Sequence, residues 1–121
     1  MEQYVSIWLG NFNDYETFEK YFHIDYSEDG DSIASNFERD FDIYYYDRDM
    51  VEKDWIEIPE NRVEILLEGF SYDEQIISKI KLEKSYNTIV LLYGYKYNSD
   101  KKYVSSTKYE LNFIDVIEYI E

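Results

Sequence analysis

The segment that most constrains the fold is YNTIVLLYGYKY at residues 86–97, in which apolar side chains fill every position from Ile89 to Leu92. β-Branched and aromatic residues of this kind favour extended backbone. A strand that is apolar on both of its sides belongs in the interior of a sheet rather than at its edge. We therefore predict one long, central strand here.

Further strand patterns occur at residues 4–9, 55–59, 102–106 and 109–119. In the first of them, Val5, Ile7 and Leu9 alternate with their neighbours at the period of two that is typical of a strand. Gly10 is expected to end this strand. Pro59 is expected to stop the short strand that precedes it, because proline cannot donate a backbone hydrogen bond.

Helical spacing of apolar residues appears between the first and second predicted strands, and again between the second strand and residue 86. The predicted helix starts are Asn13, Ser32, Asn61 and Ser71. Three of these residues precede a glutamate by three positions, which is the pattern of a capping box. One strand, then helices, then a run of strands indicates an α+β fold. We expect a single domain, residues 1–121, with three to four helices packed on a largely antiparallel sheet.

Charge is unevenly distributed along the chain. The sequence contains 27 acidic and 12 basic residues, a net charge of −15. Residues 1–60 carry 17 acidic and four basic residues, whereas residues 61–121 carry ten and eight. The electric field of such a negatively charged protein repels nucleic acid and anionic membranes, and it accelerates encounter with cationic partners. Neither nucleic acid nor a membrane is therefore expected as a partner.

Several chemistries lack the residues they need. The chain has no cysteine and a single histidine, His23. The segment 25–36 resembles a calcium-binding EF-hand loop at its start, but Asn36 stands where a bidentate glutamate should complete the shell. No glycine-rich phosphate loop is present. No metal or cofactor is expected, and the number of carboxylates makes any close acidic pair uninformative about catalysis.

The segment DFDIYYYDRDM at residues 40–50 concentrates four aspartates and three consecutive tyrosines. If the chain is extended after Phe41, the side chains of Asp42, Tyr44 and Tyr46 point to one side. Ionised carboxylates are not buried without partners, so most of these aspartates face water or another molecule. Tyrosine is enriched at recognition surfaces. Composition leaves two interpretations equally open, a docking face for Lys and Arg side chains or a core edge with solvated aspartates.

Several blocks of the chain resemble the bacterial immunity protein 22 family of polymorphic toxin systems, over nearly its whole length. The blocks are VSIWLGNF at 5–12, DYSEDGD at 25–31, SNFERDFDIYYYDRD at 35–49, LLEGFSYDEQII at 66–77 and IVLLYGYKY at 89–97. The resemblance implies a cytoplasmic antidote that binds a cognate secreted toxin domain and blocks it. None of the blocks is a catalytic motif, and the resemblance identifies no binding residues.

We therefore predict a non-enzymatic inhibitor that binds a cognate toxin with a basic surface, as a nuclease that presents Lys and Arg to phosphates would have. The alternative is an acidic mimic of nucleic acid that binds other basic proteins. The acidic loop from Asp25 to Asp31 is the second choice of docking face, and the oligomeric state is left open. The candidate partner-binding residues are Asp40, Asp42, Tyr44, Tyr45, Tyr46, Asp47, Asp49 and Trp55.

Overall fold

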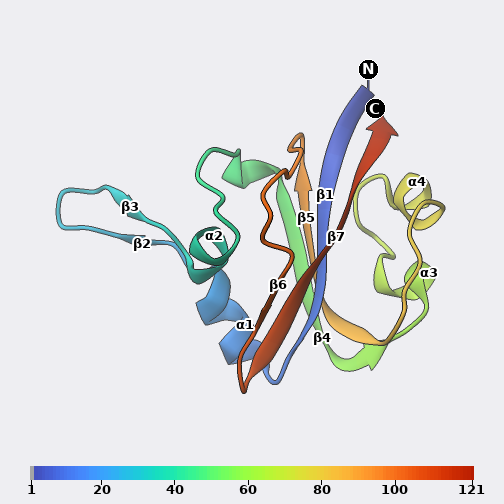
Figure 1. Ribbon diagram of the computed structural model, residues 1–121, viewed down its shortest axis with the longest axis horizontal. Helices are drawn as coiled ribbons and strands as arrows, with labels where there is room; N and C mark the ends of the chain where they lie inside the picture. Colours follow the sequence, from blue (N-terminus) through green and yellow to red (C-terminus); the bar gives the residue numbers. More distant parts are fainter. Residues whose placement is uncertain (1) are drawn as a thin grey trace.

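A five-stranded antiparallel sheet forms the middle of the molecule (Figure 1), and the computed structural model describes residues 2–121. The strands lie in the order β4-β5-β1-β7-β6, with every neighbouring pair antiparallel. The predicted α+β class with a largely antiparallel sheet is confirmed. The strands of this sheet are β1 Glu2–Phe12, β4 Val51–Glu60, β5 Tyr86–Tyr93, β6 Tyr103–Ser105 and β7 Tyr109–Ile120.

Short helices cover both faces of the sheet (Figure 1). On one face lie α1 Tyr15–Phe22 and α2 Asn36–Asp40, and on the other lie α3 Val63–Leu66 and α4 Asp73–Ile77. A small hairpin of β2 Asp25–Tyr26 and β3 Ser32–Ile33 projects from the α1 and α2 side. A single 3-10 turn, η1 Arg48–Met50, leads into β4.

The segment predicted to be a central strand is β5, which ends at Tyr93 and lies between β4 and β1. Each of its eight residues is buried. Ile89 and Leu91 face the helices α3 and α4, whereas Val90 and Leu92 face α1 and α2. The run of apolar side chains from Ile89 to Leu92 is therefore explained by two separate cores, one on each face.

Successive side chains of β1 point alternately into the two cores. Val5, Ile7 and Leu9 pack with Leu67 and Ile76 on the α3 and α4 side. The other core is mainly aromatic and is centred on Trp8. Its indole contacts four rings at centroid distances of 5.0–5.7 Å, those of Phe37, Phe41, Tyr97 and Phe113. Edge-to-face contacts of this kind add stabilisation beyond the burial of area.

Gly10 does not end β1 as expected, because the strand continues to Phe12. Its role is to permit a close approach of β7. A Cβ atom at this position would lie 2.9 Å from the Leu111 Cα and still closer to the Glu110 carbonyl oxygen. Glycine in a strand commonly marks such a contact between backbones.

The helix starts differ from the predicted ones, because the expected caps are engaged elsewhere. At α1 the cap is Asp14, whose carboxylate accepts a hydrogen bond from the Thr17 N–H at 2.7 Å. At α2 it is Ser35 rather than Ser32, which lies in β3. Ser71 does not cap α4, because its hydroxyl and N–H both donate to Glu52.

The start of α3 also lacks the predicted capping box at Asn61. The N–H groups of Asn61 and Arg62 both donate to one carboxylate oxygen of Glu60, at 2.9 Å each. Pro59 does not end β4, which extends to Glu60. The ladder with β5 is nevertheless irregular between Trp55 and Glu60, and Pro59 lies within that interruption on an edge strand.

The replacement Gly10→Ala is expected to lower the free energy of unfolding by about 3 kcal/mol, the upper end of the cost of adding a methyl group to a packed interior. The added methyl group would force β1 and β7 apart at Glu110 and Leu111. Urea denaturation measures this loss. The control is Gly30→Asn in the exposed hairpin, where asparagine tolerates the left-handed backbone. Equal stability of Gly10→Ala and wild type would contradict the close approach.

Candidate functional site

The segment 40–50 is not a strand. Asp40 ends α2, residues 41–47 form a loop, and residues 48–50 form η1. Asp42 has a left-handed backbone with φ of 56° and follows the last turn of α2. The Ile43 N–H donates to the Glu38 carbonyl oxygen at 2.9 Å, and the Asp42 N–H donates to that of Arg39 at 3.4 Å. This pair of hydrogen bonds is a Schellman motif, with aspartate at the position where glycine is usual.

The Schellman motif explains why the predicted alternation of side chains is wrong. A left-handed residue reverses the chain direction, so successive side chains after Asp42 no longer point to opposite sides. Ile43 is 1% exposed and belongs to the aromatic core. Its two successors, Tyr44 and Tyr45, are 64% and 93% exposed.

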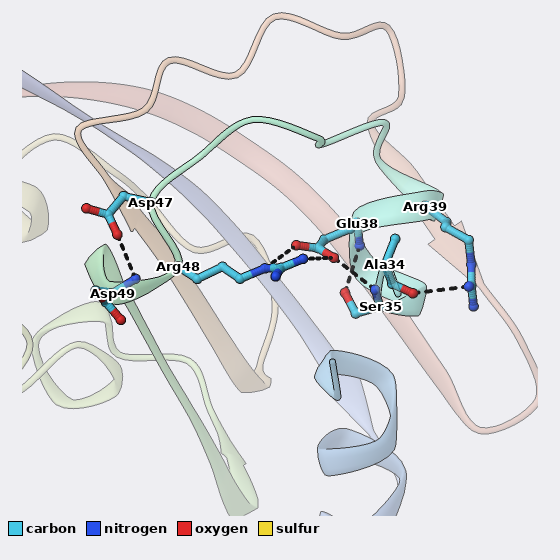
Figure 2. Close-up of polar contacts among 7 residues, drawn as sticks. All are labelled: Ala34, Ser35, Glu38, Arg39, Asp47, Arg48 and Asp49. Atoms are coloured by element: carbon cyan, nitrogen blue, oxygen red, sulfur yellow. Dashed lines mark hydrogen bonds and ion pairs between the residues drawn. The ribbon is translucent and has the colours of Figure 1, made fainter. Parts of the chain in front are cut away.

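An ion pair between the partly exposed Arg48 and the buried Glu38 holds this loop against α2 (Figure 2). Glu38 is 2% exposed, and its carboxylate accepts two hydrogen bonds from the Arg48 guanidinium, at 3.0 and 3.1 Å. The Ser35 N–H also donates to this carboxylate, at 2.9 Å, and the Ser35 hydroxyl accepts from the Glu38 N–H. Glu38 therefore completes the capping box of α2 and anchors the far end of the loop.

Electrostatics keep the Glu38 carboxylate ionised. Burial alone would raise its pKa, but the hydrogen bonds from Arg48, Tyr46 and the Ser35 N–H outweigh burial and hold the pKa below its usual value. Burial, together with the neighbouring Glu38 carboxylate, raises the pKa of the Tyr46 phenol. Tyr46 is therefore a neutral donor that contributes to the same network, and its ring packs against Tyr95 at 6.2 Å.

Several of the sequence-predicted residues hold the structure in place. The Asp40 carboxylate accepts a hydrogen bond from the Tyr21 hydroxyl at 2.9 Å. Asp47 caps η1 by accepting from the Asp49 N–H at 2.9 Å. Together with Asp42 in the Schellman motif and half-buried Tyr46, these residues shape the loop.

Trp55 lies on β4, five residues beyond η1. Its indole N–H donates to the Phe12 carbonyl oxygen at 3.0 Å. Its ring lies 6.0 Å from that of Tyr15, at the start of α1. These contacts place Trp55 beside the beginning of α1, and they give it a role in joining β4 to the neighbouring elements.

Side chains exposed to solvent cover the remainder of the loop. Tyr44, Tyr45, Asp42, Asp47 and Asp49 are all exposed. We define residues 42–49 as the docking loop. It therefore presents two large phenol rings and three carboxylates from a backbone that is fixed at one end by the Schellman motif and at the other by Arg48.

The charge asymmetry of the sequence becomes an asymmetry between the two faces of the sheet. The segment between β1 and β4, residues 13–50, carries twelve acidic and three basic residues, a net charge of −9. The segment between β4 and β5, residues 61–85, carries five acidic and four basic residues, a net charge of −1. The layer formed by α1, α2, the hairpin and the docking loop is therefore the acidic face.

The residues that resemble an EF-hand loop form the β2–β3 hairpin, which projects from the molecule (Figure 1). His23 precedes this hairpin and lies 2.9 Å from a carboxylate oxygen of Asp25. Across residues 2–121, the structure contains no group of three or more His, Asp or Glu side chains arranged to hold a metal ion.

The Glu38–Arg48 pair is not among the residues predicted from the sequence, although one signal for it is present there. Ser35 and Glu38 stand at the spacing of a capping box, which would have located the start of α2. No local sequence pattern indicates that Arg48, ten residues later, binds the Glu38 carboxylate. That contact depends on the turn at Asp42.

Comparison with known proteins identifies the family. A family model described as Immunity protein 22 matches residues 5–119. The chain belongs to the immunity protein 22 family. The resemblance inferred from the sequence is thereby confirmed. No curated protein matches the chain, and no solved structure matches it.

Membership of the immunity protein 22 family points to the neutralisation of a toxin in general, by a class of proteins that are not usually enzymes. It implies a cognate toxin as the partner. Among residues 2–121, no helix is long and apolar enough to cross a membrane.

Replacing Arg48 with methionine is expected to lower the free energy of unfolding by about 3 kcal/mol, the low end for removing one partner of a buried ion pair, because Arg48 is itself partly exposed. Urea denaturation at neutral pH measures the loss. The matched control is Arg39→Met on α2, because Arg39 is exposed and surface replacements usually change stability by about 0.5 kcal/mol or less. The Arg39 side chain donates to the Ala34 carbonyl oxygen of its own segment (Figure 2) and forms no ion pair with Glu38. Equal losses in the two variants would refute the anchoring role of Arg48.

The stability gap between wild type and Arg48→Met is also expected to depend on pH. The pKa of Glu38 in the folded protein lies below its ordinary value of 4.5. Its contribution is therefore complete above pH 4.5 and is lost as the pH falls through the lowered folded value. In Arg48→Met the buried Glu38 loses the hydrogen bonds that lower its pKa, so acid protonates it earlier than in the wild type. Denaturation series should therefore show a gap that is widest at neutral pH and narrows as the pH falls. If the difference in free energy of unfolding stayed constant over the whole pH range, the lost stability would come from the packing of the Arg48 side chain instead.

Proposed function

We propose that the protein neutralises a cognate bacterial toxin domain by binding a basic surface on it through the acidic face, with the docking loop at the centre of contact. The single observation that carries this proposal is the exposure of Tyr44 and Tyr45 beside Asp42, Asp47 and Asp49 on an anchored loop. The proposed action is inhibition by binding, without a chemical step and without a cofactor.

Preorganisation supports the choice of this loop. The rings of Tyr44 and Tyr45 are 64% and 93% exposed in the free protein. Burial of this apolar surface by a partner is favourable and would contribute to the free energy of binding. Tyrosine also loses little conformational entropy on binding, since it has few rotatable bonds. Because the backbone on either side is held by the Schellman motif and by Arg48, binding does not have to order the loop.

Charge supports a toxin whose active surface is cationic. A net charge of −9 on the acidic layer attracts a basic partner and steers its approach, which raises the association rate. A nuclease must present Lys and Arg side chains to phosphates, so its active surface has the complementary sign. We therefore propose a nuclease-type toxin, and rapid capture in the cytoplasm of the producing cell suits an antidote.

The test is binding to the toxin domain encoded immediately upstream, measured by calorimetry at about 50 mM and about 200 mM salt. The variant replaces Asp42, Asp47 and Asp49 by asparagine, which tolerates the left-handed backbone at Asp42 and can still cap η1 at Asp47. Affinity should fall about tenfold at low salt, which corresponds to about 1.4 kcal/mol. Its salt dependence should flatten, because three charges no longer contribute.

The matched control neutralises three exposed carboxylates in the layer on the other side of the sheet, as Glu64→Gln, Glu74→Gln and Glu83→Gln. It has the same net charge as the variant and should keep most of the affinity. Equal weakening in both proteins would mean that net charge alone matters and would remove the docking loop from the interface. Binding of an unrelated basic nuclease with the same affinity would instead favour a mimic of nucleic acid.

A further inference from the structure

A cavity of about 170 Å³ opens beside the end of the docking loop, where η1, the loop before α4 and the end of β7 meet. Its lining residues are Asp49, Met50, Glu52, Ser71, Tyr72, Tyr93, Tyr119 and Glu121. We call this cavity the tyrosine pocket. It is far larger than a single water molecule requires. Asp49 belongs to both the pocket and the docking loop, so the two surfaces are continuous.

Three phenol rings from separate elements form the wall of the tyrosine pocket. Tyr72 and Tyr119 have ring centroids 4.8 Å apart, and the ring of Tyr93 stands perpendicular to that of Tyr119 at 5.7 Å. Tyr93 and Tyr119 lie on β5 and β7, which flank β1, so the sheet itself sets their spacing. Aromatic faces carry negative potential and attract cations.

Carboxylates complete the lining, and no Lys or Arg is among the lining residues. Glu52 is held in place, since the Ser71 N–H and hydroxyl donate to its two oxygens at 2.8 and 2.6 Å. The Tyr93 hydroxyl lies 2.6 Å from the Ser71 carbonyl oxygen and 3.1 Å from a Glu52 oxygen. Asp49 and Glu121 are exposed.

The three tyrosines differ in how far they are exposed. Tyr119 is 1% exposed and lines the inner part of the cavity wall. Tyr72 has a left-handed backbone with φ of 59°, a conformation that is rare for a bulky residue, and its side chain remains partly exposed.

We propose that the tyrosine pocket binds one arginine side chain of the toxin. A guanidinium group is planar and stacks on aromatic rings, and its N–H groups can donate to the carboxylates of the pocket. This proposal rests on the proposed function, because it names a group of the basic partner that binds beside the docking loop. A charged aromatic pocket at the side of an interface is a typical anchor site, where one residue supplies much of the affinity.

The first experiment needs no toxin. N-acetyl-arginine methylamide is titrated into the isotope-labelled protein at low salt, and the resonances of Tyr72, Tyr93 and Tyr119 are followed by NMR. The control ligand is the citrulline analogue, which has the same shape without the charge. We expect saturable shifts of these tyrosines with the arginine compound only. Equal shifts with both compounds, or shifts outside the pocket only, would overturn the proposal.

Two variants locate the binding. Asp49→Asn removes one carboxylate, and Tyr72→Asn removes one ring while keeping a residue that tolerates the left-handed backbone. Each should weaken arginine binding at least threefold, whereas Glu83→Gln, at an exposed glutamate that does not line the pocket, should leave it unchanged. Thermal melts confirm that each variant is folded. Unchanged arginine binding by folded Tyr72→Asn would overturn the assignment.

The second experiment measures the affinity of Tyr72→Asn for the upstream toxin domain. Loss of one anchor side chain should weaken binding about tenfold or more. Unchanged, tight binding would exclude the tyrosine pocket from the interface and leave the proposed neutralisation of the toxin intact. Failure of the wild-type protein to bind the toxin would refute the proposed function, whatever the arginine titration shows.

Discussion

The structure depends on the need to cover both faces of one sheet. β5 is buried at every position and β1 is apolar on both sides, so neither strand could face water. The chain meets this requirement with two helical layers of different character. The layer before β4 builds an aromatic core around Trp8, and the layer after β4 builds a mainly aliphatic core around Leu67 and Ile76.

This division also separates the charges. Each layer is one continuous segment of chain between two strands, so the composition of that segment becomes the composition of one face. Residues 13–50 therefore place their net charge of −9 on a single side of the sheet. Concentrated charge of one sign disfavours compaction. The pairing of Glu38 with Arg48 and the aromatic packing beneath offset this repulsion locally.

The docking loop and the tyrosine pocket differ in how they would contribute to binding. Exposed carboxylates on the loop act at long range and chiefly raise the association rate. A pocket walled by Tyr72, Tyr93 and Tyr119 acts only on contact, and it would lengthen the lifetime of the complex. Because Asp49 lies at the boundary of both, the proposed basic partner would be steered towards the pocket that would retain it.

The sequence by itself determined the fold class, the central position of β5 and the acidic first half, because strand alternation and composition are local properties. It also carried the family resemblance. Only the tertiary structure decided which residues cap the helices and which aspartates are free to meet a partner. Ser71 is bound to Glu52 of β4, and Asp42 takes a left-handed turn that ends the predicted alternation. The Glu38–Arg48 pair and the tyrosine pocket join residues from different elements, and such contacts are set by the packing of the sheet rather than by any local pattern.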